Sequence, residues 1–92
     1  MAKFLIEVPH DPSPVGCARA VEVFLKSGSH FFTHADWGCR DGVHKAWIIV
    51  ELGSRDETRR TLPPAYRTAA TIVQLNAFKI DEIDEFLHQY KP

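Results

Sequence analysis

The chain has 92 residues, of which 45% are hydrophobic and 25% are charged, and this composition indicates one globular domain spanning residues 1–92. Eleven basic and twelve acidic residues give a formal net charge of −1, so the sequence offers no basic surface for nucleic acid or for an anionic membrane. No apolar run approaches the roughly 20 residues of a membrane span, and the first residues lack the apolar core of a signal peptide. Two cysteines do not form a disulfide framework, and we therefore expect a cytoplasmic protein.

The first part of the chain predicts a strand followed by a helix. Polar and apolar residues alternate over residues 3–8 (KFLIEV), as in a strand with one buried face. Ser13 and Pro14 are typical of a helix start, because a serine side chain caps free N–H groups and a proline needs no hydrogen-bond partner there. Apolar residues at helical spacing continue this helix up to Gly28, a typical C-terminal stop.

The middle of the chain predicts a β-hairpin. Residues 29–37 (SHFFTHADW) and 43–52 (VHKAWIIVEL) have strand character, and the loop between them contains two glycines that permit a positive φ. We prefer the register that places Asp36 opposite Lys45, because it pairs opposite charges across the two strands. A slip of one residue would send Asp36 to the other face of the sheet.

The last part of the chain predicts a helix, a strand and another helix. Ser54 stands three residues before Glu57, which is the spacing of a capping box, and two prolines end this helix. Residues 71–78 (TIVQLNAF) predict a fourth strand, and residues 80–90 predict a helix with acidic residues in its first turn. The order β-α-β-β-α-β plus a C-terminal helix predicts an α+β, ferredoxin-like fold, in which helices cover one face of an antiparallel four-stranded sheet.

Such a sheet has one face without helices, which we call the bare face. We expect Val73 and Leu75 to lie under the helices, together with the other apolar strand residues. The bare face then carries aromatic, apolar and polar side chains: His30, Phe32, His34, Asp36, Lys45, Trp47, Ile49, Glu51, Leu5, Glu7, Gln74 and Asn76. A surface this apolar favours a partner, and the sheet of a second copy is the expected cover.

The element order, the chain length and the half-apolar bare face resemble those of the dimeric α+β barrel superfamily, in which two ferredoxin-like sheets stack into a shared barrel. Residues 33–39 (THADWGC) and 41–47 (DGVHKAW) look like the signature of an uncharacterised bacterial family within it. The resemblance implies a homodimer formed through the bare face. Small members of the superfamily include isomerases, monooxygenases and haem-degrading enzymes, so a cofactor-independent isomerase or monooxygenase is one alternative function.

The hairpin is rich in residues that bind transition metals. His34 and Asp36 stand two apart on the same strand face, so this pair is a candidate ligand set for a divalent transition metal. His30 lies ~13 Å from His34 along a strand and cannot share an ion with it. His44 joins the pair only in the slipped register, and a third ligand would come from Glu7 or from a second copy. The alternative is that these histidines make ordinary hydrogen bonds.

His34 and Asp36 are also the candidate catalytic residues. A histidine beside a carboxylate suits a general base, Asp36 would orient it, and Trp47 offers an aromatic floor for a planar substrate. The alternative is that Asp36 and Lys45 form a cross-strand ion pair and that Trp47 packs in a dimer interface. The sequence leaves open whether the protein is an enzyme.

Several residues are candidates for contacts with a small ligand: His30, Trp47, Lys45, Glu51 and Arg67. Arg67 is among them because a guanidinium can hold a carboxylate. His10 either forms part of a turn or lines the mouth of a pocket, while Cys39 is expected to be a turn residue and Cys17 part of the helix core. We therefore expect a cytoplasmic homodimer that binds a small ligand or a metal ion near residues 30–47.

Overall fold

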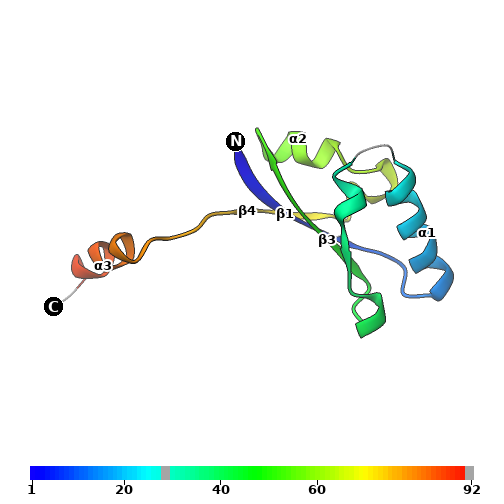
Figure 1. Cartoon of the computed structure of the whole chain (residues 1–92), viewed down its shortest axis with the longest axis horizontal. Helices are drawn as coiled ribbons and strands as arrows, with labels where there is room; N and C mark the ends of the chain where they lie inside the picture. Colours follow the sequence, from blue (N-terminus) through cyan, green and yellow to red (C-terminus); the bar gives the residue numbers. More distant parts are fainter. Residues whose placement is uncertain (28–29, 91–92) are drawn as a thin grey trace.

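The structure is a computed structural model that describes residues 1–27 and 30–90, and it has an α+β fold built on a four-stranded antiparallel sheet (Figure 1). The strands are β1 (Ala2–Pro9), β2 (Asp36–Trp37), β3 (Lys45–Leu52) and β4 (Thr71–Leu75). Their order across the sheet is β2-β3-β1-β4. The two longest strands are therefore central, and β1 pairs with β3 over its whole length.

Three α-helices accompany the sheet: α1 (Pro14–Lys26), α2 (Arg55–Arg60) and α3 (Ile80–His88). The two predicted caps are present. Ser13 Oγ accepts a hydrogen bond from the N–H of Gly16 (2.9 Å), and Ser54 Oγ accepts one from the N–H of Glu57 (3.1 Å). In the described part of the chain, no helix is long and apolar enough to cross a membrane.

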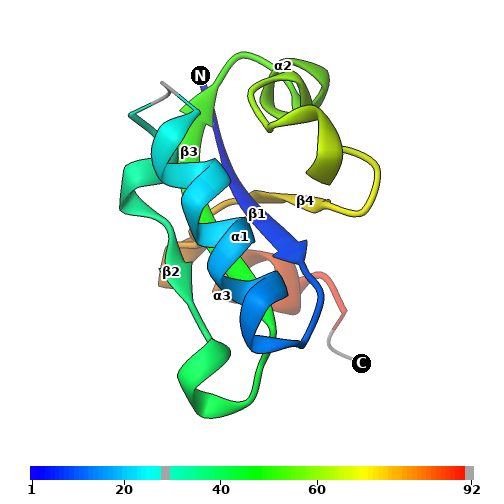
Figure 2. The same ribbon diagram turned by 90° about the vertical axis from the view of Figure 1, so that its right-hand side faces the viewer.

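The hydrophobic core lies between one face of the sheet and the layer formed by α1 and α2, as Figure 2 shows. Alternate residues of β1, namely Phe4, Ile6 and Val8, are buried on this face. Phe24 of α1 packs onto them, and its ring centroid lies 5.2–5.4 Å from those of Phe32, Trp37 and Tyr66. The predicted assignment of the first strand and first helix is confirmed.

The predicted strand at residues 29–37 is wrong for most of its length. Residues Phe32–His34 form a 3-10 turn, and only Asp36–Trp37 pair with β3. The Thr33 hydroxyl donates to the His30 carbonyl (2.8 Å), a local bond that competes with strand pairing. This turn points Phe32 into the core, where it is 1% exposed, instead of onto the bare face. Gly28, the predicted end of the first helix, and Ser29, the first residue of the predicted second strand, lie outside the described residues.

The hairpin register also differs from the prediction. Asp36 lies opposite Trp47 rather than Lys45, and Trp37 lies opposite Ala46. The shift is two residues, so Asp36 and Trp47 still share one face. The reason lies in the connection, where residues 38–43 form a compact turn. In this turn, the backbone N–H groups of Gly42 and Val43 donate to the carbonyls of Cys39 and Gly38.

The prediction that Val73 and Leu75 of β4 lie under the helices was wrong, because the two faces of this strand are exchanged. Val73 lies opposite Leu5 and Leu75 opposite Lys3, so these two apolar side chains are on the bare face. Ile72, opposite Ile6, fills the core position instead. The bare face thus gains Val73 and Leu75. It loses Phe32, which is in the core, and Gln74, which lies opposite Phe4.

Candidate metal centre

Two histidines meet where the central strands end. His10 directly follows β1 and His44 directly precedes β3. The backbone N–H of His10 donates to the backbone carbonyl oxygen of His44 (3.1 Å). This hydrogen bond continues the β1–β3 ladder by one residue pair. The two imidazole centroids consequently lie 5.9 Å apart in an edge-to-face arrangement.

The loop between β2 and β3 brings Cys39 to these histidines. Gly38 N–H donates to the Lys45 carbonyl (3.1 Å), and Val43 N–H donates to the Gly38 carbonyl (3.0 Å), so the loop folds back on itself. Figure 2 shows this loop and the first turn of α1 at the same end of the sheet. Cys39 Sγ lies 3.2 Å from Nε2 of His10.

The hydrogen bonds of His10 define its free nitrogen. Its Nδ1 lies 3.0 Å from the Asp11 carbonyl oxygen, which can only accept, so Nδ1 carries the proton. Nε2 of the neutral ring is then an acceptor, open to the Cys39 thiol or to a metal ion. A histidine oriented through Nδ1–H to a backbone carbonyl is the usual arrangement of a metal ligand.

One atom each from His10, Cys39 and His44 forms a cluster in which all three atoms lie within 4.8 Å of one another. Zinc binds nitrogen at ~2.0–2.1 Å and sulfur at ~2.3 Å, so ligand atoms in a tetrahedral site are roughly 3.3–3.8 Å apart. The pair formed by His10 and Cys39 is already this close. The other pairs are at most 4.8 Å apart, so binding of an ion would require these atoms to move about 1 Å closer together.

The cluster is half-buried, and one of its nitrogen atoms has no partner. His44 Nδ1 is buried and makes no hydrogen bond with the described residues. Buried polar atoms without partners are rare in proteins and need an explanation. A metal ion in the cluster can supply a partner for this imidazole.

Cys17 brings a second sulfur to the same place. It lies on α1, and the hydrogen bond of its thiol with Cys39 raises its pKa above the usual value, with burial as the second cause. An open cavity of about 460 Å³ adjoins both cysteines and is also lined by Val21, Ala35, Asp36, Trp37 and Arg40. Cys17 therefore lies beside the cluster, although its sulfur is not one of the three atoms that lie within 4.8 Å of one another.

The Asp11 carboxylate adds negative charge beside the histidines. The backbone N–H of Ser13 donates to it (2.8 Å), and this bond, followed by that of the Ser13 side chain, holds the pKa of Asp11 below its usual value. The charges of His10 and His44 lower the same pKa by smaller amounts. An ionised carboxylate at this position favours a cation nearby.

The predicted pair is not part of the cluster. His34 is exposed in the 3-10 turn, and Asp36 lies on β2, where it lines the cavity beside the cysteines. His30 is also exposed and packs on the ring of Phe31 with centroids 4.4 Å apart. The structure thus brings only Asp36, among these three polar residues, to the cavity beside the candidate centre.

The predicted ligand-contact residues lie in three other places. Lys45 (3.5 Å) and the Trp47 indole N–H (3.0 Å) both contact the Glu7 carboxylate on the bare face. Glu51 is exposed at the opposite end of β3. Arg67 donates to the carbonyl oxygens of residues 60 and 62, so its guanidinium holds the chain after α2. These residues do not converge on one site in the structure.

Comparison with models of known protein families, with curated proteins and with solved structures gives no match. The resemblance to the dimeric α+β barrel superfamily therefore stays a prediction. The sequence analysis did not predict that His10, Cys39 and His44 lie together. One sequence signal could have indicated the two histidines, because the end of the first strand and the start of the third are neighbours in the predicted sheet.

Proposed function

We propose that this protein binds one divalent transition metal ion, with zinc preferred, through His10, Cys39 and His44 and with Cys17 as the fourth ligand. The observation that carries the proposal is the cluster of three ligand atoms within 4.8 Å, together with the second cysteine beside Cys39. Two thiolates and two imidazoles are a common ligand set of structural zinc sites, and magnesium and calcium prefer oxygen ligands instead.

The ion would connect four separate parts of the chain. His10 and His44 belong to the ends of the two central strands, Cys39 to the loop after β2, and Cys17 to α1. Because the unfolded chain does not hold these residues together, metal binding would stabilise the folded state. The affinity should fall as the pH falls, since protons compete with the ion for sulfur and nitrogen.

Titration of the reduced, tag-free protein with Co²⁺ tests the site directly. Cobalt bound to thiolate gives a charge-transfer absorption band, and a tetrahedral site gives intense visible bands. We expect one equivalent of Co²⁺, displaced by Zn²⁺. The charge-transfer band should fall to about half its intensity in Cys39→Ser, because Cys17 still supplies one thiolate, and the affinity should be at least about tenfold lower in His44→Ala.

The control variant is His34→Ala, because His34 is exposed and lies outside the cluster. It should bind cobalt as the wild type does. Loss of binding in His34→Ala with retention in His44→Ala would contradict the proposed ligands and would favour the pair of His34 and Asp36. Absence of the charge-transfer band in the wild type would contradict a thiolate ligand altogether.

We also propose that the fold is ferredoxin-like and that the protein is a homodimer formed through the bare face. The antiparallel order β2-β3-β1-β4 and the position of α1 and α2 on one face support the first part. Ile49 and Val73, which are exposed on the bare face, support the second part.

A further inference from the structure

The C-terminal helix stands apart from the rest of the molecule. Figure 1 shows that the chain leaves β4 and carries α3 away from the sheet and from α1 and α2. The molecule is accordingly elongated, with extents of 57 × 29 × 21 Å. Residues 76–79 contain no described turn or bend, and neither glycine nor proline occurs among them. This extended segment, of roughly 13 Å, directs α3 outward and does not fold it back.

The helix and its connection expose a set of large apolar side chains. Five of them are 53–74% exposed: Phe78, Ile80, Phe86, Leu87 and Tyr90. Phe86 of α3 and Tyr90 of the turn that follows have ring centroids 4.9 Å apart, so their rings form one apolar surface at the end of the helix. An isolated helix of nine residues is not stable in water, and packing of its apolar side must stabilise α3.

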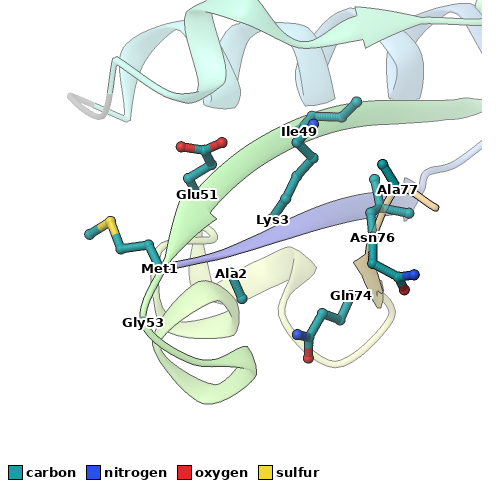
Figure 3. Close-up of a pocket in the computed structure, with 10 residues that line it drawn as sticks. Met1, Ala2, Lys3, Ile49, Glu51, Gly53, Gln74, Asn76 and Ala77 are labelled. Atoms are coloured by element: carbon teal, nitrogen blue, oxygen red, sulfur yellow. The ribbon is translucent and has the colours of Figure 1, made fainter. Parts of the chain in front are cut away.

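The bare face offers the complementary surface. Ile49 is 61% exposed and Val73 is 43% exposed, on strands that flank β1. An open hollow of about 750 Å³ lies on this face, and Figure 3 shows Lys3, Ile49 and Glu51 along it. No described residue of α1, α2 or α3 lines this hollow.

We infer that α3 of one copy packs its apolar side on the bare face of a second copy, and that the second copy returns the same contact. The inference rests on the proposed homodimer and adds the element that covers the face. Two arms exchanged about a two-fold axis satisfy both apolar surfaces at once and form a closed assembly. A second copy is the occupant because the extended segment carries α3 beyond its own sheet.

The charges of the two surfaces support this partner. The helix carries Asp81, Glu82, Asp84 and Glu85 within two turns. Lys3 lies at the edge of the hollow and forms no ion pair with the described residues, and the chain's N-terminal residue also lines it. An acidic helix from the second copy would give Lys3 a partner, although Glu51 reduces the local positive charge.

The area is sufficient for a stable dimer. Burying the exposed parts of Phe78, Phe86 and Tyr90 from two arms removes roughly 600–1,000 Å² of aromatic surface. The sheet surface beneath them adds a comparable area, which brings the total to about 1,200–2,000 Å², the range of specific interfaces.

Mass measurement by light scattering at micromolar concentration tests the dimer. We expect twice the chain mass of 10.4 kDa for the full-length wild type. Phe86→Glu on the helix and Ile49→Glu on the sheet should each raise the dimer dissociation constant roughly tenfold or more. Val15→Glu is the matched control, because Val15 is as exposed as Ile49 (61%) but lies on α1, and it should leave the dimer unchanged.

Photo-crosslinking tests which surfaces meet. We would replace Phe86 by p-benzoylphenylalanine, mix copies labelled with ¹⁴N and ¹⁵N, and identify the crosslinked peptides by mass spectrometry. We expect links from position 86 of one isotopic copy to peptides containing Ile49 or Val73 of the other.

Three results would overturn the inference. A monomeric wild type would refute both the arm exchange and the proposed homodimer. Links from position 86 only within one copy would show that α3 folds back on its own sheet. A dimer that Phe86→Glu leaves intact would keep the homodimer. If p-benzoylphenylalanine placed at position 49 instead then links to peptides around position 49 of the other copy, the two sheets stack directly.

Discussion

Zinc should stabilise the folded protein through Cys39, and the size of the effect follows from linkage. At a free zinc concentration one hundred times Kd, binding to the folded state alone adds about 2.7 kcal/mol to the free energy of unfolding. For a chain of 92 residues, this corresponds to a rise in Tm of roughly 11–22 °C.

Cys39→Ser removes the sulfur that lies 3.2 Å from His10 Nε2, with little change in side-chain size. If the loss of this ligand weakens zinc affinity one-hundredfold, the same zinc concentration adds only about 0.4 kcal/mol. The rise in Tm then shrinks to roughly 2–3 °C. Without zinc, the two proteins should unfold at nearly the same temperature, because Cys39 lies in a half-buried loop outside the hydrophobic core.

The assay is thermal unfolding followed by circular dichroism, under reducing conditions, with chelator or with zinc. His34→Ala is the matched control and should keep the full shift, since His34 lies outside the cluster. An equal zinc-dependent shift in wild type and Cys39→Ser would refute the ligand assignment. A large difference between the two proteins in chelator would show that Cys39 acts through packing.

Three further predictions concern the core, the loop and the second cysteine. Phe24→Ala should lower the free energy of unfolding by about 3–5 kcal/mol in urea titrations, because the ring is buried among three aromatic neighbours; a loss typical of a surface site would contradict that packing. Gly42→Ala should cost about 1–2 kcal/mol by the same measurement, because Gly42 has φ 79° and no atom lies near enough to repel a Cβ. Alkylation of Cys17 by iodoacetamide at mildly alkaline pH should be faster in Cys39→Ala than in wild type, because losing the hydrogen bond lowers the raised pKa of Cys17; an unchanged rate would indicate that the bond does not control this thiol.

Local sequence signals predicted much of the fold. The caps at Ser13 and Ser54 and the alternation in the first strand depend on neighbouring residues, and the structure has all three. The sequence failed where tertiary contacts decide the conformation. Phe32 fits a strand pattern, but its ring packs in the core against Phe24 of α1. Residues Phe32–His34 consequently form a 3-10 turn and not a strand.

The candidate site was predicted only in its residue types. Histidine, cysteine and carboxylate near the hairpin indicated a transition metal, but the pair of His34 and Asp36 was chosen because both were assigned to one strand. β2 begins at Asp36 and His34 lies in the 3-10 turn before it, so this reason disappears. His10 and Cys39 are 29 residues apart, and their contact depends on the path of the loop, which no periodic pattern records.

The candidate centre combines two residues at the ends of the central strands with one residue of a loop. His10 and His44 are held by the continuation of the β1–β3 ladder, whereas Cys39 depends on the loop that Gly38 begins. A Cβ on Gly38 would lie 2.7 Å from the Val43 carbonyl oxygen and 2.8 Å from the Trp47 ring, so only glycine allows this close approach. Gly38→Ala should therefore displace Cys39 and weaken the cobalt charge-transfer band, while the two histidines stay paired. Gly53→Ala is the control, because a Cβ there meets only the flexible carboxylate of Glu57; equal bands in the two variants would show that the loop does not position the sulfur.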